Sequence, residues 1–177
     1  MTKSESPPST HSFFAVSPPG LEAIVSAELA ALGLRVGDSV PGGVEWSGSL
    51  EDLYRANLWA RTPNRVLMRL GDFHATNFAE LFKRAARINW DRWIDPAAAP
   101  VRLRVTTRKS RLYHSGAVEE RFRDAIERRV PGLRFVKGEA DPEPGGSRPE
   151  QLIVVRLEWD RVFVSLDSSG ELLSRRG

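Results

Sequence analysis

The sequence contains no cysteine, and this absence removes several kinds of chemistry at once. Disulfide bonds, thiolate metal sites and a cysteine nucleophile are all excluded. Histidine is also scarce, because the only imidazoles are those of His11, His74 and His114, with no HxH or HxxxH spacing among them. A bound transition metal usually requires such groupings. We therefore expect this chain to hold no metal.

Long hydrophobic runs are missing as well. No apolar stretch approaches the roughly 20 residues that a membrane-spanning helix requires. The first residues, MTKSESPPSTHS, are polar and rich in proline and serine, unlike a signal peptide. We predict a disordered tail over residues 1–11, no association with a membrane and, with the lack of cysteine, a cytoplasmic location.

Sequence motifs of common catalytic sites are also absent. There is no GxGxxG, no GxxxxGK[ST] and no GxSxG, so neither a nucleotide cradle nor a serine nucleophile elbow is supported. The segment Asp167-Ser168-Ser169-Gly170 places an acid beside two hydroxyls, but this composition is more typical of a turn that hydrogen-bonds its own backbone. We expect no catalytic residue and no cofactor in this chain.

The composition is that of a globular protein. Of the 177 residues, 41% are hydrophobic and 28% are charged, which is enough for one ordinary domain or two small ones. The net charge of +3 favours anionic partners only if the basic residues are clustered.

The first half of the chain shows alternating strand and helix patterns. Two local signals are clear: Pro41-Gly42-Gly43 indicates a hairpin, and Ser49 with Asp52 forms a capping box. The predicted elements are a strand over 13–16, a helix with its apolar stripe from Leu21 to Leu32, strands over 34–40 and 42–48, a helix ending at Ala60, and a strand over 65–71. This β-α-β-β-α-β order is typical of the ferredoxin-like fold, which we predict for residues 12–75.

The second half predicts another small α/β unit, over residues 76–170. Its expected order is a helix with its apolar stripe from Phe78 to Ile88, the strand VRLRVTT, a helix capped by Ser115, and two closing strands, QLIVVRLEW and RVFVSLD. In VRLRVTT we expect Val101, Leu103 and Val105 to point inward and Arg102 and Arg104 to point outward. Trp90 and Trp93 are expected to pack in the core. The fold class is therefore α/β (α+β).

A basic stretch without a carboxylate runs from Val101 to Gly116. Its cations would form a continuous positive patch beside the N-terminus of the following helix, whose free N–H groups suit a phosphate. Arginine and lysine bind phosphates without reading sequence, whereas Tyr113 or His114 could contact a base or a 2′-hydroxyl. A solvated edge that aids solubility accounts for the charge equally well. The basic residues of the stretch are Arg102, Arg104, Arg108, Lys109 and Arg111.

Several segments resemble known RNA-modifying enzymes. RKSRLYHSGAVEERFRDAIERRV is similar to the strand-loop-helix of the THUMP domain, an RNA-binding module, and RVFVSLDSSGELLSRRG to the end of that domain. FFAVSPPGLEAIVSAELAALG, GGVEWSGSLEDLYRANLWARTPNRVLMRLG and LFKRAARINWDRWI resemble, in the same order, the N-terminal part of the class I methyltransferases that act on guanine N2 of 23S ribosomal RNA, and of their tRNA-acting relatives.

The resemblance implies a ferredoxin-like unit and a THUMP unit that together bind rRNA or tRNA for a C-terminal methyltransferase domain. That domain would carry an S-adenosylmethionine loop and an (Asn/Asp)-Pro-Pro-aromatic motif. The nearest match here, Ser17-Pro18-Pro19-Gly20, lacks both the amide or carboxylate and the ring. Residues 171–177 would begin the linker to the catalytic domain, so the chain would be either a fragment or a stand-alone binding module.

RNA binding without catalysis is therefore the function we expect. The predicted RNA-binding residues are Arg102, Arg104, Arg108, Lys109, Ser110, Arg111 and His114. One alternative is a docking module without RNA affinity. A weaker one is an acylphosphatase-type enzyme, in which the loop after the first strand would wrap the phosphate; two prolines in that loop have no N–H to donate.

Overall fold

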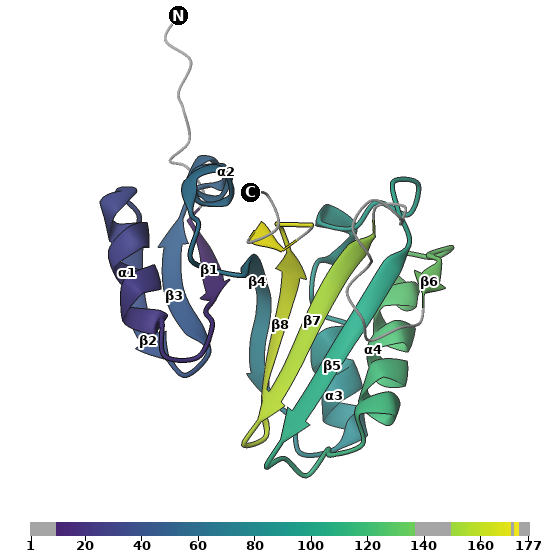
Figure 1. The fold of residues 1–177 in the computed structure, drawn as a ribbon. Helices are drawn as coiled ribbons and strands as arrows, with labels where there is room; N and C mark the ends of the chain where they lie inside the picture. Colours follow the sequence, from purple (N-terminus) through teal and green to yellow (C-terminus); the bar gives the residue numbers. More distant parts are fainter. Residues whose placement is uncertain (1–9, 137–149, 171, 174–177) are drawn as a thin grey trace, which may run out of the picture. The chain divides into compact units, whose positions relative to one another are not determined.

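The computed structural model describes residues 10–136, 150–170 and 172–173 (Figure 1). These residues form two compact units: the first contains the described residues up to Met68 together with 172–173, and the second is Arg69–Gly170. The division falls inside strand β4 (Arg65–His74). The domain limits given above stay a prediction. Most of the predicted tail (1–11) and of the predicted linker (171–177) lies outside the described residues.

The first unit has the β-α-β-β-α-β order of a ferredoxin-like domain, as predicted. Its strands lie in the order β2-β3-β1-β4, and β1 pairs antiparallel with both β3 and β4. Its elements are β1 (His11–Val16), α1 (Glu22–Ala31), β2 (Arg35–Val40), β3 (Gly43–Gly48), α2 (Leu50–Trp59) and the start of β4. The core is formed by Phe13, Val25, Leu29, Val44 and Ala56, which are all fully buried.

Local hydrogen bonds account for the turns of this unit. The predicted capping box is present, because Ser49 Oγ accepts from the N–H of Asp52 (3.2 Å) and the Asp52 carboxylate accepts from the N–H of Ser49 (2.9 Å). At Gly43 any side chain would collide with the carbonyl oxygen of Ala15 and with the ring of Phe14. This position of the hairpin therefore requires glycine.

Two glutamates of α1 hold neighbouring loops. The Glu22 carboxylate accepts from the N–H of Gly42 (3.0 Å), and that hydrogen bond is the main reason why its pKa lies below the ordinary value. The Glu28 carboxylate accepts from the N–H groups of Arg61 (2.8 Å) and Thr62 (3.0 Å). Both glutamates lie in the segment FFAVSPPGLEAIVSAELAALG that carries the family resemblance, and both fix loops of the ferredoxin-like unit.

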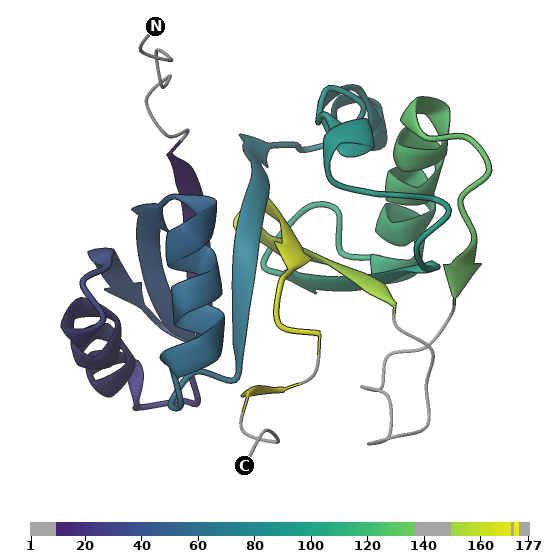
Figure 2. The same cartoon turned by 90° about the horizontal axis from the view of Figure 1, so that it is seen from above.

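The second unit is a sheet with two helices on one of its faces. Its strands lie in the order β8-β7-β5-β6, with the end of β4 beside β8; β5 is parallel to β6 and β7, and β7 is antiparallel to β8. Figure 2 shows α3 and α4 on the same side of these strands. The remaining elements are α3 (Phe78–Ala85), the 3₁₀ turn η1 (Trp90–Arg92), β5 (Val101–Arg108), α4 (Ser115–Arg129), β6 (Phe135–Val136), β7 (Gln151–Glu158) and β8 (Arg161–Asp167).

The core of the second unit confirms the interpretation of Trp90. Its ring is fully buried, and its indole N–H donates to the carbonyl oxygen of Ala85 (2.9 Å). Leu81, Phe122, Ile126 and Ile153 surround the same core.

Three details of this unit differ from the predictions. Helix α3 ends at Ala85, and Ile88 reaches the core from the following turn. Strand β6 was not predicted, because two residues are too short for a periodic pattern. The N-cap of α4 is His114, one residue before Ser115. No helix of the described residues is long and apolar enough to cross a membrane.

Candidate nucleic-acid interface

Five of the predicted RNA-binding residues gather at one end of the second unit. Arg108 ends β5, and Lys109, Ser110, Arg111 and His114 lie in the connection from β5 to α4. The two-residue turn between β7 and β8, Trp159-Asp160, lies at the same end (Figure 1). We call the side chains of Arg108, Lys109, Arg111, Tyr113, His114 and Trp159 the tip surface.

Arg102 does not lie on an open surface, and the expectation that it points freely outward is wrong. It is 8% exposed, and its Nη2 lies 2.6 Å from Oε2 of Glu150. The reason is its place between two strands, since β5 pairs with β6 on one side and with β7 on the other. Arg104, two residues further along β5, is half-buried. The predicted continuous patch is therefore confined to the end of the strand.

Asp160 ties the two loops of the tip together. Its carboxylate accepts from the N–H of Arg111 (2.7 Å), and its own N–H donates to Ser110 Oγ (3.1 Å). The Ser110 hydroxyl in turn donates to the carbonyl oxygen of Arg108 (3.0 Å), which also accepts from the N–H of Trp159 (3.3 Å). Ser110 thus organises the tip, and its hydroxyl is occupied by backbone contacts.

The backbone of the tip adopts conformations that side chains rarely take. The φ angles of Lys109, Trp159 and Asp160 are +48°, +53° and +63°. Aspartate tolerates the left-handed region, but lysine and tryptophan carry a cost there of about 1–2 kcal/mol each. A two-residue hairpin turn with two positive φ angles normally contains asparagine or glycine. Trp159 thus occupies a turn position that its side chain disfavours, and its ring is 65% exposed.

Cations and aromatic rings alternate over the tip surface. Nζ of Lys109 lies 4.6 Å from the centroid of the Trp159 ring, and the rings of Tyr113 and His114 lie 4.1 Å apart. Trp159 is 65% exposed and Tyr113 is 67% exposed. Lys109 and His114 each cover part of one ring, and the rest of both rings is accessible to a planar group from solution.

The acids of the tip lie deeper than its cations. Arg108 Nη1 is 3.5 Å from Glu158 Oε1, and Arg111 Nε is 3.8 Å from Asp160 Oδ2. The side chains of these arginines are 69% and 74% exposed, whereas both carboxylates are 25% exposed. Exposed ion pairs of this kind contribute only about 0–1 kcal/mol, so both guanidinium groups remain available to a stronger anion. The tip surface presents positive charge to solvent.

The N-terminus of α4 adds backbone donors beside these cations. No side chain caps the helix at His114, and no acidic residue occupies its first turn. The first N–H groups of a helix have no partners within it and attract anions. A side chain added at Gly116 would meet no atom within 4 Å, so this part of the helix is open.

Two parts of the surface were missed by the sequence interpretation. Trp159 was read only as the end of a strand, although a tryptophan in a tight turn was a usable signal. Four cations along α3 and α4 were also missed, because helices far apart in the sequence bring them together. The described residues contain no group of three or more His, Asp or Glu side chains placed to hold a metal ion.

The chain is similar to RNA methyltransferases over most of its length. It is 34% identical over 177 residues to the ribosomal RNA large subunit methyltransferase K/L of Methylococcus capsulatus, covering 96% of this chain and 22% of that protein. It is 31% identical over 168 residues to a putative RNA methyltransferase of Synechocystis sp., and this match covers 95% of this chain and 42% of that protein. The chain thus spans between about a fifth and two fifths of the length of these curated relatives.

Solved structures and a family model agree with the fold. The crystal structure of a predicted N6-adenine-specific DNA methylase from Listeria monocytogenes superposes with a TM-score of 0.80 at 30% identity, covering 96% of this chain and 43% of that one. Residues 12–67 match the model of the RlmL ferredoxin-like domain. The first unit therefore has a ferredoxin-like fold and is similar to the RlmL ferredoxin-like domain, and the chain is similar to part of the ribosomal RNA large subunit methyltransferases K/L.

Proposed function

We propose that this chain is the RNA-binding part of an RNA methyltransferase and that it does not catalyse methyl transfer by itself. The tip surface is the observation that carries the proposal. It combines three exposed cations, two exposed aromatic rings and an uncapped helix N-terminus within one end of the second unit. Phosphates would bind the cations and the helix N–H groups, and unpaired bases would stack on the rings.

The relatives support RNA as the partner. Both are named as RNA methyltransferases, and each is at least twice as long as the matched chain. We infer that the second unit is a THUMP domain and that the whole protein carries a C-terminal class I catalytic domain. That domain would use S-adenosylmethionine and methylate guanine N2 in rRNA or tRNA in the cytoplasm. The chain's own contribution would be to hold the RNA.

The loop after β1 is a poor fit for the acylphosphatase-type alternative. The acylphosphatase-type alternative would require the loop after β1 to donate several N–H groups to a phosphate. In that loop the Ser17 N–H already donates to the carbonyl oxygen of Gly42 (3.0 Å), and Pro18 and Pro19 have none. The alternative of a docking module can be distinguished from the proposed function by an RNA-binding measurement, because a docking module would have no affinity for RNA.

A titration tests the proposal. Fluorescence anisotropy of a labelled 23S rRNA hairpin, measured with the full chain at several salt concentrations, should show saturable binding. If about five phosphates are contacted, log K should fall against log salt with a slope of about −3.5 to −4.5. A DNA duplex of equal length is the comparison, since one structural neighbour is named as a DNA methylase. Absence of RNA binding at low salt, or stronger binding to the DNA, would overturn the proposal.

A further inference from the structure

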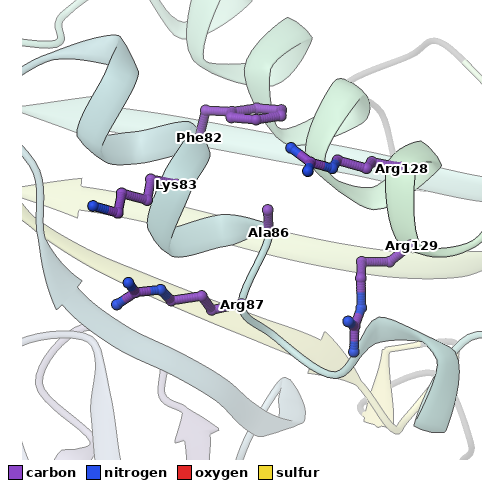
Figure 3. Close-up of a pocket in the computed structure, with 6 residues that line it drawn as sticks. All are labelled: Phe82, Lys83, Ala86, Arg87, Arg128 and Arg129. Atoms are coloured by element: carbon purple, nitrogen blue, oxygen red, sulfur yellow. The ribbon is translucent and has the colours of Figure 1, made fainter.

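A second basic site lies between the two helices of the second unit. A hollow of about 410 Å³ opens between α3 and α4. Figure 3 shows the residues from both helices that line it. We call this the helix groove; it is lined by Phe82, Lys83, Ala86, Arg87, Arg128 and Arg129.

The charge of the helix groove is of one sign. Four of its lining residues are cations and none is an acid. Lys83, Arg87 and Arg128 are exposed, and their side chains form no hydrogen bond or ion pair with any residue that the structure describes. Arg129 is held by the side-chain oxygens of Asn89 and Asp91, both at 3.3 Å. Three cations are therefore available to a ligand.

Helix ends explain only part of this arrangement. Cations are favourable in the last turn of a helix, which accounts for Lys83 on α3 and for Arg128 and Arg129 on α4. Arg87, however, follows the C-cap of α3, so the helix end does not account for its charge. The packing of α3 on α4 then adds Arg128 and Arg129 to the same hollow. This accumulation disfavours the unliganded protein and favours an anion in the groove.

The floor of the groove is apolar. Phe82 and Ala86 are half-buried there, and the Arg128 guanidinium lies 5.9 Å from the centroid of the Phe82 ring. A second hollow continues the groove along the same helices and shares Phe82 and Arg128 with it. The second hollow also contains Asp124, whose carboxylate pairs with Arg121 (3.0 Å). The helix groove itself has an apolar floor and cationic walls, which suit a polyanionic strand whose sugars would lie on the floor and whose phosphates would face the cations.

We propose that the helix groove binds the sugar-phosphate backbone of the same RNA that the tip surface holds. This inference rests on the proposed function and deepens it. The tip is at the N-terminal end of α4 and the groove at its C-terminal end, so the two sites are separated by about 20 Å, the length of a helix of this size. A structured RNA that spans this distance would occupy both sites, and a few nucleotides would occupy only one.

The test uses the full chain with the cations of the groove removed. The variant Lys83→Ala/Arg87→Ala/Arg128→Ala should bind the rRNA hairpin about tenfold more weakly or worse at 0.1 M salt. Its salt slope should be shallower by about 2–2.7, because each of three lost phosphate contacts contributes roughly 0.7–0.9. The matched control is Arg35→Ala/Arg55→Ala/Arg61→Ala, which removes the same charge from exposed positions of the first unit. The conservative variant Lys83→Arg/Arg87→Lys/Arg128→Lys should retain binding.

The outcomes separate this inference from the proposed function. If the unaltered chain binds no RNA, the proposed function fails. If it binds RNA and only the tip variant, Arg108→Ala/Lys109→Ala/Arg111→Ala, weakens binding, the groove inference fails alone. If the groove variant and the control lose equal RNA affinity, the loss reflects only the lower net charge of the chain. That result would overturn the inference. Polyglutamate binding that depends on the groove, without a groove effect on RNA, would assign the groove to an acidic protein partner instead. A circular dichroism melt of each variant shows that a loss of binding is not a loss of fold.

Discussion

Nζ of Lys109 lies 4.6 Å from the centroid of the Trp159 ring, so two loops that are distant in sequence present one cation–aromatic pair to solvent. Both residues hold left-handed backbone conformations, and Asp160 fixes the loops that carry them. The pair is thus built by tertiary structure at a conformational cost. A base that stacks on the ring would place its phosphate close to the ammonium group and to Arg111.

Replacement of Trp159 by alanine should weaken RNA binding without changing its salt dependence. Stacking of one base on an aromatic ring contributes about 1–3 kcal/mol, and no charge is lost in this variant. Anisotropy titrations at two salt concentrations measure both quantities. Tyr54→Ala, which removes a ring that is 63% exposed on α2, is the control and should leave binding unchanged. An unaltered affinity in Trp159→Ala would exclude stacking at this position.

Removal of the Asp160 carboxylate should destabilise the second unit. Asp160→Ala loses the acceptor of the Arg111 N–H, and hydrogen bonds to a charged group contribute about 1.5–3 kcal/mol. Asp160→Asn keeps an oxygen acceptor and tolerates the positive φ angle, so its loss should be smaller. Urea unfolding at neutral pH compares the two variants. Equal stability of Asp160→Ala and the unaltered chain would show that the carboxylate does not hold the loops.

Arg102 should be needed for stability and not for RNA contact. Arg102→Ala leaves the largely buried Glu150 without its partner, and breaking a buried ion pair costs about 3–5 kcal/mol. The free energy of unfolding should fall by about that amount or somewhat less, while the salt slope of RNA binding stays the same under conditions where the variant is folded. A shallower salt slope of RNA binding together with unchanged stability would show that Arg102 contacts RNA.

Acid should weaken the contact between α1 and the first hairpin. The hydrogen bond from Gly42 lowers the pKa of Glu22, so folding favours the carboxylate form. The resulting stability is fully present above the ordinary value of 4.5 and is lost as the pH falls through the lowered pKa of the folded state. The stability difference between the unaltered chain and Glu22→Gln should therefore shrink between pH 6 and strongly acidic pH. Urea unfolding across that range measures it, and a difference that is constant with pH would contradict the assignment.

Local signals made much of the fold predictable from the sequence. The capping box at Ser49, the hairpin at Gly43 and the apolar stripes of the helices depend on neighbours in the chain, and the ferredoxin-like order of the first unit followed from them. The burial of Arg102 could not be predicted from the sequence, because it arises from the parallel pairing of β5 with β7 and from the contact with Glu150. The helix groove was hidden for the same reason, since its walls meet only when α3 packs on α4.

The same distinction applies to the tip surface. Its cations were visible as a run of basic residues in one segment, and the structure places Arg108, Lys109 and Arg111 at one exposed end. The contribution of Trp159 depends on the β7–β8 hairpin, which lies much later in the chain. The hydrogen bond that joins the two loops links Arg111 to Asp160, which are 49 residues apart in the sequence. Whether these residues bind RNA stays a prediction.

The salt dependence of RNA binding tests the central claim most directly. Anisotropy titrations of the rRNA hairpin over a series of salt concentrations should be run with the unaltered chain, with Arg108→Ala/Lys109→Ala/Arg111→Ala, and with the control Arg35→Ala/Arg55→Ala/Arg61→Ala. We predict that the tip variant has a slope shallower by about 2–2.7, while the control keeps the slope of the unaltered chain. A tip variant with an unchanged slope would contradict the assignment of the tip surface as the RNA-binding site.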